Sequence, residues 1–161
     1  MQGIYSRRGR IALAVAVLVV LGAAGGAWWS ARSSTDRAAD GRAALTAATE
    51  AAQVIFSYDY RSFDAGVAKA KPYLTGGFAT EYAQTTASLK ATAQKEQAVV
   101  QVQVSGAGIV DSDGHRVDLL IYLNQYRRNT NVNGEKVDQN RVVLTMTRVG
   151  RAWKVSAAAA I

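Results

Sequence analysis

The sequence predicts an α+β protein: an N-terminal transmembrane helix followed by a cone-shaped domain of about three helices packed on a curved four-stranded antiparallel sheet. Three observations lead to this prediction. Residues 11–29 carry no charged side chain, and such a run can cross a bilayer core of roughly 30 Å as a helix. Apolar residues then recur at helical spacing as far as Ala93, and beyond Glu96 they alternate as in strands. Helices followed by consecutive strands are typical of the α+β class.

The first ten residues form a basic tail, with Arg7, Arg8 and Arg10 directly before the apolar run. A cleaved signal peptide is the alternative to an uncleaved anchor. Signal peptides have apolar cores of about 7–15 residues and small residues at the cleavage site. Here the run is longer and ends in Trp28 and Trp29, as expected for an aromatic belt at a membrane surface. We therefore expect an uncleaved membrane anchor at residues 11–29.

The orientation of this anchor follows from the lengths of its two flanks. A short basic tail stays in the cytoplasm, whereas long domains cross the membrane largely regardless of their charge. Residues 1–10 are thus expected in the cytoplasm, and residues 36–161 outside the cell (inner) membrane as one domain. The small polar residues 30–35 are expected to link the two.

Three helices are expected in the first half of the domain. The first runs from Asp36 to about Tyr58, because its apolar positions share one face. The second begins at the capping residue Ser62 and ends before Pro72, which cannot continue a helix. The third follows Gly76. The apolar positions of the three faces are Leu45, Ala48, Ala52 and Ile55; Phe63, Val67, Ala70 and Leu74; and Phe78, Tyr82, Thr86, Leu89 and Ala93.

Four strands are expected in the second half. The first alternates through Val100, Val102 and Val104 and weakens at Gly106 and Gly108, which favour a bulge. The second is apolar on both faces and should lie centrally, after a turn at residues 111–114. Residues 127–140 are polar and contain Asn133-Gly134, a hairpin signal. Residues 141–149 and 151–157 form the last two strands, with Trp153 and Val155 facing inward.

The composition excludes several kinds of site. The chain has no cysteine, which removes disulfides, thiolate metal ligands and cysteine nucleophiles. The formal net charge is +7, yet in the domain only Arg127 and Arg128 are adjacent, so we expect no nucleic-acid partner. A mildly basic domain can instead be drawn to anionic lipid headgroups. The expected partners are membrane lipid and other envelope proteins.

Few residues are candidates for catalysis or metal binding. His115 is the only histidine and lies in a predicted turn beside Asp111 and Asp113, where a solvated role is expected. Tyr58, Asp59 and Tyr60 could run a proton transfer, but adjacent residues at a helix end point in different directions.

The Gly76-Gly77 pair could bind an anion at a helix start, although it lacks the spacing of a phosphate loop. A helix break is the preferred interpretation. We therefore predict no catalytic, cofactor-binding or metal-binding residues, and no enzyme activity. A small apolar pocket and a filled core would give the same sequence pattern.

Several local sequences carry a resemblance to a known family. These are residues 58–61 with Phe63-Asp64, residues 74–78, residues 123–125, and Trp153-Lys154-Val155. With one preceding membrane helix, they resemble the Mce-associated membrane proteins of actinobacteria, whose domain resembles nuclear transport factor two. This resemblance implies a non-catalytic accessory subunit that supports the assembly or stability of an Mce-type lipid or sterol importer. Two alternatives remain: a scaffold of a type IV secretion or conjugation complex, and a tethered isomerase or hydratase.

Overall fold

The computed structural model describes residues 37–131 and 133–161. The predicted tail, anchor and linker, at residues 1–35, lie outside the described residues. Ala39–Ile161 form one compact unit. Within the described ranges, no helix is both long enough and apolar enough to cross a bilayer.

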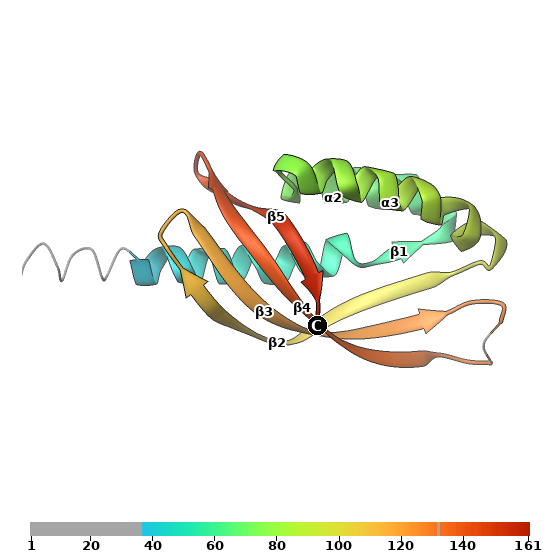
Figure 1. Cartoon of the computed structure of the whole chain (residues 1–161). Helices are drawn as coiled ribbons and strands as arrows, with labels where there is room; N and C mark the ends of the chain where they lie inside the picture. The colour runs from blue at the N-terminus through green and yellow to red at the C-terminus, as the bar shows by residue number, and fades with distance from the viewer. Residues whose placement is uncertain (1–36, 132) are drawn as a thin grey trace, which may run out of the picture. The chain divides into compact units, whose positions relative to one another are not determined.

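Three helices build the first half of this unit, as predicted (Figure 1). The first occupies residues 37–55 and buries a stripe of alanines; α2 is Phe63–Ala70 and α3 is Gly76–Lys95. Ser62 does stand at the N-cap of α2, but its hydroxyl makes no capping hydrogen bond. Pro72 lies in a short 3-10 turn, η2 (Lys71–Tyr73). Helix α2 therefore ends at Ala70, before the proline, as predicted.

Within the residues that the structure describes, the sheet has five strands, and the prediction of four was wrong. The strands follow the order β1-β2-β3-β4-β5, all antiparallel. Their bounds are β1 Tyr58–Asp59, β2 Val99–Ser112, β3 Arg116–Arg128, β4 Lys136–Val149 and β5 Ala152–Ala160. The additional strand, β1, is only two residues long, and the sequence pattern had placed it at the end of the first helix. It pairs with the start of β2, so it carries the chain from helix to sheet edge.

The strands are also longer than the alternation indicated. β4 begins at Lys136, within the stretch expected to be a polar connection, and β5 continues through the terminal alanines to Ala160. The predicted bulge is confirmed, because the β2–β3 register shifts between Val104 and Gly106. Gly134, in the connection between β3 and β4, has φ of 83°, a conformation that glycine adopts without strain.

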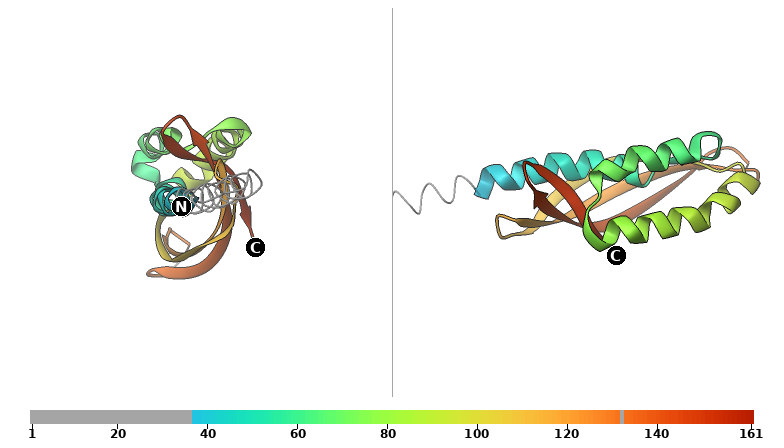
Figure 2. Two further views of the ribbon diagram at one scale, coloured as in Figure 1. Left: turned by 90° about the vertical axis from the view of Figure 1, so that its left-hand side faces the viewer. Right: turned by 90° about the horizontal axis from the view of Figure 1, so that it is seen from above.

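The sheet bends around the helix of residues 37–55, while α3 lies beside β5 and α2 lies beside β1 and α3 (Figure 2). Buried side chains from the helices meet the inward-facing side chains of β2–β5 in one core. Leu119, Ile121, Leu144, Met146 and Val155 are its largest fully buried members, together with Val117. Trp153 is 9% exposed and Val155 is fully buried, so both face inward as predicted. A backbone bridge from Leu74 to Val155 joins the end of η2 to the outer edge of β5.

A candidate binding cavity

A cavity of about 520 Å³ lies between the helices and the concave side of the sheet. Its volume falls within the range of small-ligand sites, roughly 300–1,000 Å³. The end of the first helix and β1 contribute one wall, α2 and α3 a second, and β2–β5 the floor. The apolar part of this lining comprises Ile55, Phe56, Phe63, Val67, Phe78, Leu89, Val100, Leu123, Val142, Ala158 and Ala160. The sequence did not show this cavity, because the residues that line it have the same pattern as a filled core.

Polar side chains from β3 and β4 line one part of the cavity. Gln125 and Asn140 contribute a hydrogen bond of 3.0 Å across the two strands. Arg127 pairs through Nη2 with Asp138 at 2.9 Å, while its Nε is buried and has no hydrogen-bond partner in the described residues. Together with Arg141, this leaves one side of an apolar cavity able to donate hydrogen bonds.

Two tyrosines in the lining have perturbed acidity. Partial burial raises the pKa of Tyr58; Glu96 adds to this rise and Arg127 opposes it. Partial burial also raises the pKa of Tyr82, whose hydroxyl lies 3.4 Å from the carbonyl oxygen of Ile55. Both phenols are therefore neutral at ordinary pH and can act as hydrogen-bond donors, not as bases.

The three adjacent candidates Tyr58, Asp59 and Tyr60 do not converge. Tyr58 lines the cavity and packs edge-on against Phe63, with ring centroids 5.7 Å apart. Asp59 caps the short 3-10 turn η1 (Tyr60–Ser62) and accepts hydrogen bonds from the backbone and guanidinium of Arg61. This side-chain hydrogen bond is the main reason that the pKa of Asp59 is lowered. Tyr60 is not among the residues that line the cavity.

His115 is exposed in the β2–β3 turn, at the end of β3 far from the cavity-lining Arg127. Neighbouring Asp113 accepts backbone hydrogen bonds from His115 and Arg116, at 3.0 and 2.7 Å, and these bonds lower its pKa. Asp113 therefore shapes the turn. Among the described residues, no group of three or more potential ligands could hold a metal ion.

Gly76 and Gly77 stand at the start of α3. Gly76 has φ of 61°, in the left-handed region that favours glycine, and it is the first residue of the helix. Both glycines are exposed. Thr75 directly before them donates its backbone N–H to Val155 at 2.9 Å. The pair thus turns the chain from the sheet edge into α3.

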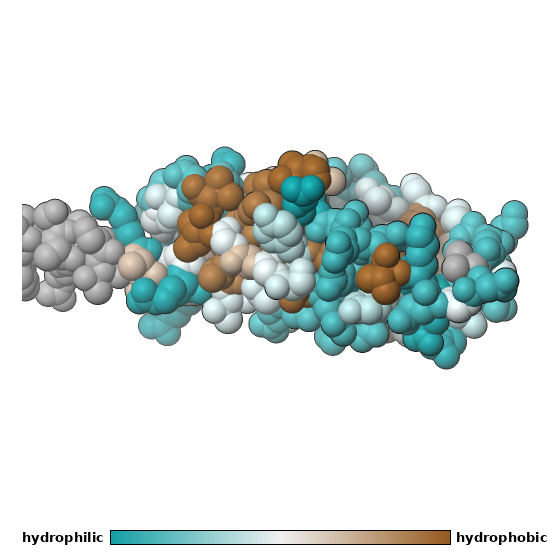
Figure 3. Space-filling view, turned by 90° about the horizontal axis from the view of Figure 1, so that it is seen from below, coloured by the Kyte–Doolittle hydropathy of each residue, from teal (hydrophilic) through white to brown (hydrophobic). Residues whose placement is uncertain are grey.

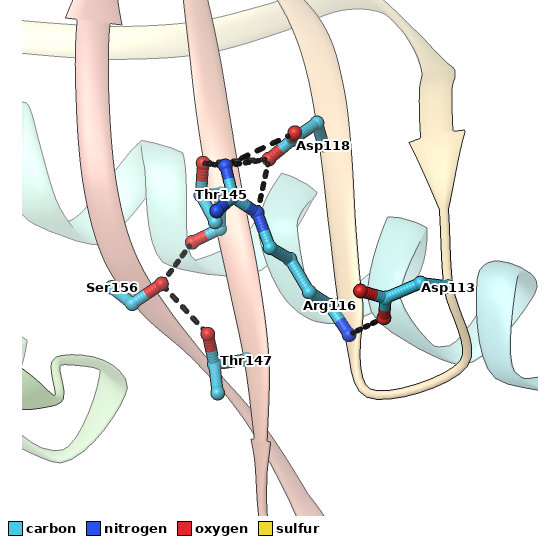
Figure 4. A network of polar contacts seen from close by, with 6 residues as sticks. All are labelled: Asp113, Arg116, Asp118, Thr145, Thr147 and Ser156. Atoms are coloured by element: carbon cyan, nitrogen blue, oxygen red, sulfur yellow. Dashed lines mark hydrogen bonds and ion pairs between the residues drawn. The ribbon is translucent and has the colours of Figure 1, made fainter.

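A polar network on β3, β4 and β5 was not predicted (Figure 4). Asp118 accepts hydrogen bonds from Thr145 at 2.7 Å and from the guanidinium of Arg116. The Ser156 hydroxyl donates to the Thr145 carbonyl at 3.2 Å and lies 2.8 Å from the Thr147 hydroxyl. The β4–β5 register shifts at this point, between Thr145 and Met146. The network satisfies polar groups at the bulge, and its role is structural.

No protein-family model matches the chain, and no curated protein sequence matches it either. Solved structures do share its fold. An IcmL-like type IV secretion system protein from Legionella pneumophila covers 73% of this chain and 88% of its own, with a TM-score of 0.61 and 18% identity. CagV, a VirB8 homologue of the Helicobacter pylori type IV secretion system, covers 72% and 94%, with a TM-score of 0.59 and 12% identity.

A periplasmic fragment of TraM gives a similar match. It covers 74% of this chain and 95% of its own, with a TM-score of 0.60 and 13% identity. At these identities the likeness establishes the fold: the described domain has the α+β architecture of these domains, with helices packed on an antiparallel sheet.

Proposed function

We propose that this chain is a non-catalytic scaffold subunit of an envelope complex of the type IV secretion kind. In this proposal, residues 11–29 anchor it in the cell membrane and the domain lies outside. The observation that carries the proposal is the extent of the structural match. The domain aligns with 88–95% of the IcmL-like, CagV and TraM structures, so the likeness covers nearly the whole of each of these domains.

The chemistry of the cavity supports binding in preference to catalysis. General acid–base catalysis needs a base and an acid positioned at one reacting centre. Here both lining tyrosines are neutral, and the Glu81 carboxylate, which also lines the cavity, is exposed on α3. An apolar cavity with donors at one side suits an apolar segment of a partner protein.

The role beside an Mce-type lipid importer has no support from the structural comparisons. Membership of the Mce-associated family stays a prediction from the local sequences named above. Both readings place a non-catalytic subunit in an envelope complex, and they differ in the partner. The partner is therefore the measurement that separates them.

Purification of the tagged full chain from native membranes in mild detergent tests the proposal. We expect channel or ATPase subunits of a secretion complex among the co-purified proteins, whereas Mce proteins with their permease would support the alternative. Deleting the chain should lower the amount of its partner, since an unassembled subunit loses the stabilisation that binding confers. Unchanged partner levels and no co-purified membrane protein would contradict both scaffold readings.

A matched pair of substitutions tests the role of the cavity. Thr85→Trp places a large ring at the cavity, which Thr85 lines from an exposed position on α3. Ser88→Trp places the same ring on the same helix at an exposed position outside the lining. We expect Thr85→Trp to reduce co-purification and Ser88→Trp to preserve it. Equal co-purification with both variants would exclude the cavity as the docking site.

A further inference from the structure

Exposed aliphatic side chains gather at one end of the domain. Ile109 is 45% exposed, Val110 63% and Val149 44%, and we call these three residues the proximal patch. Figure 3 shows apolar surface on the half of the domain where the first helix begins, whereas the opposite half is mostly hydrophilic. Large aliphatic side chains left in water at one end of a small domain indicate a surface that another phase or molecule covers.

Specific contacts place the proximal patch beside the start of the first helix. Ile109 packs so closely on Gly41 that a Cβ added there would lie 2.9 Å from the Ile109 Cδ1 atom. Arg148, directly before Val149, pairs with Asp40 at 2.7 Å. The ends of β2 and β4 therefore lie against the first turns of the helix of residues 37–55 (Figure 1).

The length of the chain between anchor and domain limits how far this end can be from the bilayer. Trp29 ends the predicted anchor, and Ala39 begins the compact unit ten residues later. Ten residues span at most about 35 Å when fully extended. If residues 11–29 span the membrane as proposed, this tether keeps the start of the first helix, and the proximal patch beside it, within about 35 Å of the bilayer.

The charges around the proximal patch are compatible with a shallow contact. Ion pairs neutralise Asp40 and Asp118, while Arg42 and Arg151 are exposed. The exposed carboxylates Asp111, directly after Val110, and Asp113 in the β2–β3 turn oppose deep insertion. A tether also raises the effective concentration of this surface at the bilayer to the millimolar range, so a weak contact is enough.

From these observations we infer that the proximal patch rests on the lipid surface of the membrane that holds the anchor. This inference depends on the anchor in the proposed function. The contact fixes the orientation of the domain, so that the cavity, on the side of α2 and α3, is presented to partners at a set height above the bilayer.

Single-cysteine labelling of the full chain tests this inference, because the chain has no native cysteine. Val110→Cys and Val149→Cys would carry an environment-sensitive fluorophore in vesicles of phosphatidylcholine with anionic phosphatidylglycerol. Val137→Cys is the matched control: this valine is 50% exposed near the β3–β4 turn, at the opposite end of the strands. We expect emission at positions 110 and 149 to shift to shorter wavelength and to be quenched by spin-labelled headgroups several-fold more than at 137.

The outcomes separate this inference from the proposed function. If carbonate extracts the chain from vesicles, the anchor is wrong and the inference falls with it. If the chain resists extraction but all three positions report a water-like environment, the inference is wrong and the anchor stands. A dry environment at position 110 that headgroup quenchers do not reach indicates a protein contact and also overturns the inference.

Discussion

Trp153 fixes the start of β5 in the core, and its truncation is a direct test of the fold. The indole is 9% exposed, and the guanidinium of Arg148 lies 5.9 Å from its ring centroid. Truncating a buried aromatic residue to alanine costs about 3–5 kcal/mol, and loss of the cation–π contact adds roughly 0.5–1 kcal/mol. We expect Trp153→Ala to lower the free energy of unfolding by about 4 kcal/mol, a large part of the 5–15 kcal/mol typical of small domains.

Thermal unfolding of the full chain in one detergent, followed by near-ultraviolet circular dichroism, measures this loss. At roughly 2–8 °C per kcal/mol, the Tm should fall by about 10 °C or more. Tyr122→Ala is the control, because this aromatic side chain is 44% exposed and its loss should have little effect. A Trp153→Ala protein that melts within a degree or two of the wild type would refute the burial of this side chain.

Three further predictions concern residues outside the core. His115→Ala and Asp59→Asn should leave partner abundance and transport by the host nearly unchanged, since the first residue is exposed and the second caps a turn; loss of transport at normal partner abundance would support the enzyme reading. Gly76→Ala should destabilise the domain by about 1 kcal/mol because Gly76 has a φ of 61°. Gly77→Ala, with open space around it, should stabilise the domain slightly. Chemical denaturation of both variants checks whether their free energies of unfolding change in opposite directions. Backbone hydrogen bonds lower the pKa of Asp113, so the stability that they contribute is present above the ordinary Asp pKa near 3.9 and is lost as pH falls through the lower folded-state value. Hydrogen exchange of the His115 and Arg116 amides should therefore rise relative to other turns only in strong acid. A rise already near neutral pH would contradict this assignment.

The helices and the central strands could be predicted because one face of each is buried. Val117, Leu119, Ile121 and Leu123 alternate along β3, and all four are buried. The two ends of the sheet could not be predicted in this way. The first six residues of β4, from Lys136 to Arg141, are exposed or half-buried and have no buried face, so they show no apolar alternation.

The candidate site was harder to predict than the fold. Tyr58 was named as a candidate together with Asp59 and Tyr60, which were expected to point in different directions; Tyr58 lines the cavity and the other two do not. Arg127 was noticed only as a possible nucleic-acid contact. Its place beside Gln125 and Asp138 depends on strand pairing between β3 and β4 and on the bend of the sheet. Tertiary placement of this kind leaves no local sequence signal.

The alanine stripe of the first helix has a consequence for the order in which the domain folds. Ala44, Ala48, Ala51 and Ala52 are all buried, yet the strands that cover them come later in the chain. If residues 11–29 anchor the chain and the domain is exported as proposed, this helix emerges before the strands that cover it. Alanine favours the helix even without a packing partner, and its small side chain exposes little apolar surface before the sheet forms. The last step of folding is the bridge between Val155 of β5 and Leu74, which covers the edge of the sheet. Chains truncated before β5 should therefore fold incompletely and be sensitive to proteolysis.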